Sequence, residues 1–105
     1  MAVDDITLSS KKIFAVSESY AEKLGTSLSP EFAAEKLHEE VGEFAKSYLI
    51  HRGLCRSEKR LSKNASKEQL GEELADVLGW VITNAALYDI DLQSHIEQKW
   101  LKKLE

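Results

Sequence analysis

The chain has 105 residues, of which 43% are hydrophobic and 30% charged, a balance typical of one small globular domain. Its formal net charge of −4 argues against nucleic acid or a membrane as partner. Cys55 is the only cysteine, so no intrachain disulfide can form and a cytoplasmic location is expected. No apolar run approaches the roughly 20 residues that span a bilayer, and residues 1–10 lack the pattern of a signal peptide.

The apolar residues recur at helical spacing from one end of the chain to the other. The first helix is expected over about residues 7–24, with Gly25 at the position after its end. The second begins after Ser29, a good N-cap, with Pro30 in its first turn, and ends by Gly53. The apolar positions of these two helices are Ile13, Val16, Tyr20, Leu24, Phe32, Ala33, Leu37, Val41, Phe44 and Tyr48.

Residues 51–65 are predicted to connect the second helix to a third, which begins at Ser66 and forms a capping box with Gln69. The third helix continues to about Tyr88, and Asp91 caps a fourth. The apolar positions of these two helices are Leu70, Leu74, Val77, Leu78, Val81, Ala85, Leu92, Ile96, Trp100 and Leu104. The sequence therefore predicts an all-α protein of four helices.

The second and third helices each carry two adjacent glutamates followed three positions later by another acid. Carboxylates at positions i and i+3 lie roughly 60° apart on one helix face. Glu40 with Glu43 forms one such pair, and Glu73 with Asp76 forms the other. In an antiparallel hairpin the two pairs fall on the same side and within about one turn of the same height.

Four carboxylates held this close would repel one another, and a divalent cation would relieve that repulsion. Ligands that are all oxygen favour Mg²⁺, with Mn²⁺ as a second candidate, over Zn²⁺. The alternative is that both runs are solvated helix faces, because glutamate is a good helix former. Glu35 and His38 match the Glu-x-x-His motif of di-iron bundles, but no second copy of the motif exists in the chain.

The stretch KLHEEVGEFAK at residues 36–46, followed by GEELADVLGW at residues 71–80, resembles the MazG-like family of all-α nucleoside triphosphate pyrophosphatases. The likeness covers about residues 30–100, within a single domain spanning 1–105. It implies a four-helix MazG-like fold and hydrolysis of a (d)NTP to the (d)NMP and pyrophosphate, a reaction suited to cleansing the nucleotide pool. It also implies that Glu40, Glu43, Glu73 and Asp76 hold Mg²⁺, and that Glu39 orients or deprotonates the attacking water.

Further candidates are weaker. The connection between the second and third helices is cationic, and Arg60 and Lys63 are the candidates there for binding phosphate. Lys99 matches a lysine near the family's C-terminal end and is a third candidate. Side chains that could line a pocket for the base are Phe14, Trp80 and Asn84, together with Tyr20. For Phe14 and Tyr20 the helical spacing favours the alternative of a role in the core.

The small size of the domain predicts an obligate homo-oligomer, in which the second and third helices pair with their copies to complete the bundle. The family resemblance implies that this oligomer is a homodimer or a tetramer. The competing functional interpretation is a non-catalytic helical module that serves interaction or regulation, with its acidic residues simply solvated. A shift in thermal melting on addition of Mg²⁺ would distinguish the two.

Overall fold

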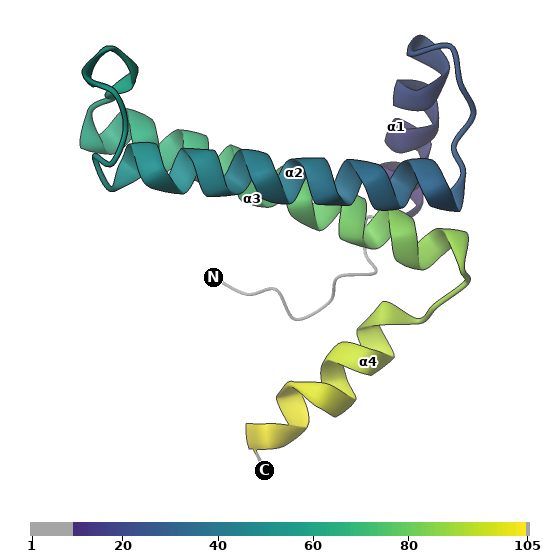
Figure 1. Cartoon of the computed structure of the whole chain (residues 1–105). Helices are drawn as coiled ribbons and strands as arrows, with labels where there is room; N and C mark the ends of the chain where they lie inside the picture. Colours follow the sequence, from purple (N-terminus) through teal and green to yellow (C-terminus); the bar gives the residue numbers. More distant parts are fainter. Residues whose placement is uncertain (1–9, 105) are drawn as a thin grey trace.

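A long antiparallel hairpin of two helices forms the body of the protein (Figure 1). The computed structural model describes residues 10–104, which form helices joined by turns and contain no strand. The hairpin consists of α2 (Pro30–His51) and α3 (Lys63–Leu87), joined by a connection that includes the short 3₁₀ helix η1 (Ser57–Lys59). Helix α1 (Ser10–Lys23) packs across α3 at the open end of the hairpin. The prediction of an all-α chain with four helices is confirmed for the described residues.

The ends of α1 and α2 follow the expected capping chemistry. Gly25 has a φ of +77° and Gly53 a φ of +73°, the left-handed conformation in which glycine ends helices. The Ser29 side chain accepts a hydrogen bond from the Phe32 amide at 3.1 Å, and Pro30 occupies the first turn. The predicted start of the first helix near residue 7 lies outside the described residues.

Helix α3 begins one turn earlier than predicted. Its N-cap is Ser62, whose hydroxyl accepts a hydrogen bond from the Ala65 amide at 3.1 Å, so Lys63 is its first residue and not part of the connection. Ser66 lies inside the helix and is 1% exposed. Its hydroxyl is 2.8 Å from Nδ1 of His51 on α2. The predicted capping box with Gln69 is therefore wrong, because both side chains instead bond across the hairpin.

Three polar contacts tie α2 to α3 at intervals along the hairpin. The Asn84 amide donates to the Ala33 carbonyl at 2.9 Å near the open end. Ser47 donates to the Gln69 side-chain oxygen at 3.3 Å, and the His51–Ser66 contact follows near the connection. These contacts fix the axial register of the two helices.

The fourth helix stands apart from the hairpin (Figure 1). As predicted, Asp91 caps α4 (Leu92–Lys99) by accepting from the Ser94 amide, and the chain continues into the 3₁₀ turn η2 (Leu101–Leu104). The predicted apolar stripe does not reach a core of this chain, because Trp100 is 65% and Leu104 86% exposed. Among the described elements, α4 has its main contacts with the adjoining turn η2.

The interior of the single chain is small. Its buried apolar residues are Ala21, Ala33, Ile82 and Ala85. A cluster of three rings, Tyr20, Phe32 and Trp80, joins α1, α2 and α3 with ring centroids 6.0–6.4 Å apart.

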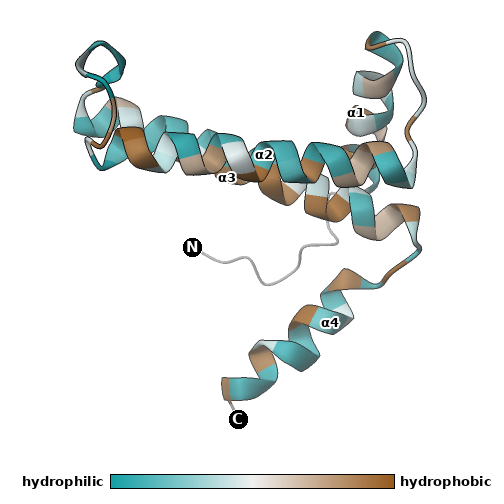
Figure 2. Cartoon of the chain, in the orientation of Figure 1, coloured by the Kyte–Doolittle hydropathy of each residue, from teal (hydrophilic) through white to brown (hydrophobic). Residues whose placement is uncertain are grey.

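Many predicted core positions of the hairpin face outward instead. Val41, Leu74 and Leu78 are between 42% and 50% exposed, because a two-helix hairpin covers only one side of each helix. Figure 2 shows apolar segments both on α3 and on the detached α4. Among residues 10–104, no helix combines the length and the apolar character that a membrane-spanning segment requires.

Candidate active site

Three carboxylates from two helices meet midway along the α2/α3 hairpin. Glu40 lies on α2, and Glu73 and Asp76 lie one turn apart on α3. One carboxylate oxygen from each residue lies within 4.8 Å of the other two. The two acidic motifs therefore come together across the hairpin, on one side and at one height.

The chemistry of this donor set fits a hard divalent cation. All three ligands are carboxylate oxygens, and neither histidine nor cysteine belongs to the group. Oxygen ligands suit Mg²⁺ and Mn²⁺, and Mg²⁺ commonly binds through a few carboxylates while sharing its remaining positions with phosphate and water.

The raised pKa of Glu73 also fits a site for a cation. Burial raises the pKa of the Glu73 carboxyl, and the neighbouring carboxylates of Asp76, Glu40, Glu43 and Glu72 raise it further. Loss of its proton therefore adds a charge to a site that is already negative. A bound cation would reverse this balance by favouring the ionised form.

Glu43, the fourth predicted ligand, lies beside this group but not within it. Its side chain is exposed and borders a separate surface hollow that it shares with Glu73. Its charge nevertheless contributes to the raised pKa of Glu73. Its role as a ligand stays a prediction. Glu72 is exposed and lines a different hollow with Lys67 and Glu68.

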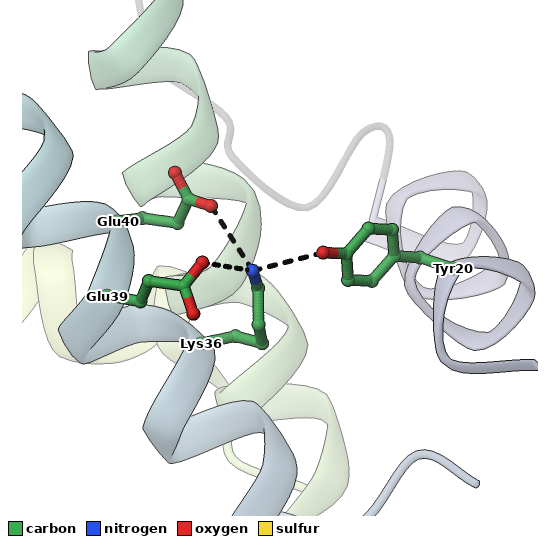
Figure 3. Close-up of polar contacts among 4 residues, drawn as sticks. All are labelled: Tyr20, Lys36, Glu39 and Glu40. Atoms are coloured by element: carbon green, nitrogen blue, oxygen red, sulfur yellow. Dashed lines mark hydrogen bonds and ion pairs between the residues drawn. The ribbon is translucent and has the colours of Figure 1, made fainter. Parts of the chain in front are cut away.

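A buried lysine lies against the acidic residues of α2 (Figure 3). Lys36 is 8% exposed and is the one charged side chain among the buried residues of the described chain. Its ammonium donates to Glu39 at 2.8 Å and to the Tyr20 hydroxyl at 3.1 Å, and it lies 3.5 Å from Glu40. Burial lowers the pKa of Lys36, but the hydrogen bonds to Glu39 and Tyr20 outweigh burial and leave the pKa above its ordinary value. Lys36 therefore stays charged at neutral pH.

The spacing of residues in the sequence already indicates the contacts of Lys36 with Glu39 and Glu40. Lys36 precedes Glu39 by three positions and Glu40 by four, the spacings at which helix side chains meet. The contribution of Tyr20 could not be inferred in this way, because it depends on how α1 crosses the hairpin. Glu39, the predicted catalytic residue, has a side chain that is 61% exposed and is hydrogen-bonded to Lys36.

A cavity of about 470 Å³ opens beside the carboxylates, between α1 and the hairpin. Glu40 and Asp76 lie at one side of it, and Lys36 is also part of its wall. The aromatic rings of Tyr20 and Trp80 line it, and the hydroxyls of Ser17 and Thr83 lie 3.1 Å apart within its lining. Rings beside a mostly apolar space suit a flat heterocycle, and the adjoining carboxylates suit a cation–phosphate complex.

The four residues predicted to line a base pocket divide into two groups. Tyr20 and Trp80 are in the cavity wall. Phe14 is not among the lining residues, and neither is Asn84, whose amide group donates to the Ala33 and Trp80 carbonyls. The two hydrogen bonds of the Asn84 amide indicate a structural role for that residue, whereas the role of Phe14 stays a prediction.

The predicted phosphate-binding residues lie away from the cavity. Arg60 follows η1, Lys63 begins α3, and Lys99 is the last residue of α4. The cations that share a hollow with Glu43 and Glu73 are Lys46, from α2, and Lys59, from η1. Lys59 is therefore the residue of the connection whose positive charge borders the acidic residues, and phosphate binding by Arg60, Lys63 and Lys99 stays a prediction.

The fold and the site together define a class of protein: an α-helical hairpin with a cluster of carboxylates beside a cavity lined by aromatic rings. Comparison with family models matches the MazG nucleotide pyrophosphohydrolase domain over residues 28–105. The match covers most of the chain, which therefore belongs to the MazG nucleotide pyrophosphohydrolase family. No curated protein and no solved structure gives a significant match.

Proposed function

We propose that the protein is a Mg²⁺-dependent hydrolase that cleaves nucleoside triphosphates between the α- and β-phosphates, releasing the monophosphate and pyrophosphate. The main support is the position of the Glu40–Glu73–Asp76 group at the edge of an aromatic-lined cavity, in a chain of this family. A nucleoside in the cavity would direct its phosphates toward the carboxylates.

The chain's own residues divide the work of this reaction. Tyr20 and Trp80 would hold the base, while Glu40, Glu73 and Asp76 would hold the cation, with Glu43 completing the set. When bound, Mg²⁺ supplies charge neutralisation for the phosphate oxygens. Glu39 would accept a proton from a water molecule whose oxygen forms a new bond to phosphorus. The bridging oxygen would then leave with pyrophosphate, so that one water is consumed for each anhydride bond broken.

Two lysines lie on the side of the carboxylates where the leaving pyrophosphate would be. The hollow that contains Lys46 and Lys59 adjoins Glu43 and Glu73, whereas the aromatic cavity adjoins Glu40 and Asp76. A triphosphate lying across the carboxylates would therefore extend its terminal phosphates toward these lysines.

The activity is tested by incubating the common NTPs and dNTPs with the protein and Mg²⁺ and measuring pyrophosphate. Glu40→Gln and Asp76→Asn, prepared alongside, should each lower the rate by about 100-fold or more, because each removes a charge that holds the cation. Hydrolysis that is unchanged in both variants would contradict the proposed site.

We also propose that the protein functions as a homodimer or a tetramer. This proposal is supported by the partly exposed apolar side chains of Val41, Leu74 and Leu78 on the hairpin and by the detachment of α4 from it. Burying such surface against a second copy would supply the core that one small chain lacks.

A further inference from the structure

Lys36 lies where the aromatic cavity and the cation site meet. Its side chain is 10% exposed, and it shares the cavity wall with Glu40 and Asp76, two of the three clustered carboxylates. On the other side it contacts Tyr20, at 3.1 Å from the hydroxyl and 5.0 Å from the ring centroid. A molecule with a base in the cavity and a phosphate at the carboxylates would therefore lie close to this ammonium group.

The ammonium group has three donors and three oxygen neighbours. They belong to Tyr20, Glu39 and Glu40, and Figure 3 shows them around Nζ. The contact with Glu40 is the longest of the three at 3.5 Å, beyond the usual length of a hydrogen bond between an ammonium and a carboxylate. A cation bound by Glu40 would compete with Lys36 for that carboxylate, and the ammonium would then have a donor to offer another anion.

From this arrangement we infer that Lys36 binds the substrate phosphate nearest the nucleoside, in exchange for its contact with Glu40. The inference rests on the proposed function and adds a substrate-binding residue to it. Lys36 is suited to the role because it is held at a fixed point by Tyr20 and Glu39 before substrate arrives, so little side-chain freedom is lost on binding.

The alternative is that Lys36 only ties α1 to α2 and balances the charge of Glu39 and Glu40. The two roles predict different effects of removing the charge. Removing a lysine that binds phosphate would lower nucleotide affinity but not cation affinity, because the positive charge beside Glu40 opposes the cation. Removing a purely structural lysine would lower both affinities together with the melting temperature.

The test uses the full chain with Lys36→Met and Lys36→Arg. Binding of Mn²⁺ alone is followed by electron paramagnetic resonance. Binding of the α,β-imido analogues of dATP, dCTP, dGTP and dTTP, with saturating Mn²⁺, is followed by calorimetry. For the analogue that binds wild type best, Lys36→Met should weaken binding about 10- to 100-fold, the loss expected for one charge-assisted hydrogen bond. Mn²⁺ affinity should be unchanged or higher.

One further variant serves as a matched control. Lys12→Met removes the other lysine that lines the same cavity, and it should change analogue binding less than about threefold because Lys12 is exposed. Lys36→Arg keeps the charge and should retain more analogue affinity than Lys36→Met; it also provides the comparison if Lys36→Met does not fold.

The outcomes separate this inference from the proposed function. Analogue affinity of Lys36→Met within threefold of wild type, or a loss matched by an equal loss of Mn²⁺ affinity, overturns the role of Lys36 and leaves the proposed hydrolysis standing. Wild type that binds an analogue but cleaves no NTP or dNTP overturns the hydrolase and not the phosphate contact. Wild type that binds none of the four analogues overturns both.

Discussion

A positively charged lysine and several carboxylates lie together at the candidate site. Lys36 balances Glu39 and Glu40 on α2, whereas Glu73 and Asp76 on α3 have no basic partner within ion-pair distance among the described residues. The unbalanced repulsion is therefore concentrated on α3, where the pKa of Glu73 is raised. The clustered carboxylates could be predicted from sequence, because helix periodicity fixes their spacing.

Stability without metal should fall as pH rises through the titration of Glu73. The folded protein holds this proton more tightly than the unfolded chain, whose glutamate titrates near 4.5. The contribution of the protonated form is thus present below that pH and is lost as pH rises through the higher folded pKa. Thermal unfolding in EDTA at about pH 4 and pH 7 should show a smaller loss for Glu73→Gln than for wild type. Equal losses would contradict the assignment.

Mg²⁺ should stabilise the folded protein through the clustered carboxylates. At 100 times its dissociation constant, a single bound cation adds about 2.7 kcal/mol to the free energy of unfolding. Asp76→Asn should abolish most of the Mg²⁺-induced shift in melting temperature. Glu72→Gln is the matched control, since Glu72 lies on the same helix outside the cluster, and it should keep the shift. An equal shift in all three proteins would locate the cation elsewhere.

At the level of helices, the start of α3 and the position of the Asn84 side chain could not be predicted because both depend on contacts between helices. Ser62 and Ser66 are both good N-cap residues one turn apart, and local pattern alone does not choose between them. The choice depends on tertiary contact, because Ser66 bonds to His51 of α2 and is buried. The same holds for Asn84, whose amide bonds to α2 rather than facing the cavity.

The N-cap of α3 should be measurable by substitution. Ser62→Ala removes the acceptor for the Ala65 amide and should lower the free energy of unfolding by about 1 kcal/mol. Chemical denaturation followed by circular dichroism measures the change. A neutral effect would contradict the assigned helix start. Ser57→Ala is the control, because Ser57 is an exposed residue of η1.

Two glycines should respond in opposite directions to substitution by alanine. Gly53 has a left-handed φ of +73°, so Gly53→Ala should destabilise the fold by about 1 kcal/mol. Gly71 lies within α3 with no atom within 4 Å of an added Cβ, so Gly71→Ala should stabilise it by about 0.5–1 kcal/mol. Denaturation midpoints test both. The same sign for the two variants would contradict the helix boundaries.

Over the whole molecule, the arrangement of the helices could be predicted less fully than their presence. The angle at which α1 crosses the hairpin depends on the cluster formed by Tyr20, Phe32 and Trp80, which joins residues distant in sequence. The prediction that α4 carries an apolar stripe was compatible with packing on its own chain or on another. Its separation from the hairpin could not be inferred from periodicity.

Assembly should be sensitive to the exposed apolar side of the hairpin. Light scattering at micromolar concentration should show a dimer or a tetramer for wild type. Leu78→Lys should shift the population toward monomer, because it places a charge where apolar surface is to be buried. Leu54→Lys is the control, since Leu54 is 60% exposed in the connection. A folded wild-type monomer would refute the proposed assembly.

The polar contacts between α2 and α3 have a consequence for the evolution of the carboxylate cluster. The link between Asn84 and Ala33 lies on one side of the carboxylates, and the links of Ser47 and His51 lie on the other. If the helices slid by a single turn, the displacement would be about 5.4 Å, larger than the 4.8 Å within which the acidic oxygens gather. Substitutions at these hydroxyl and amide positions would therefore separate the carboxylates without replacing any of them, so selection for the proposed activity would also preserve these positions.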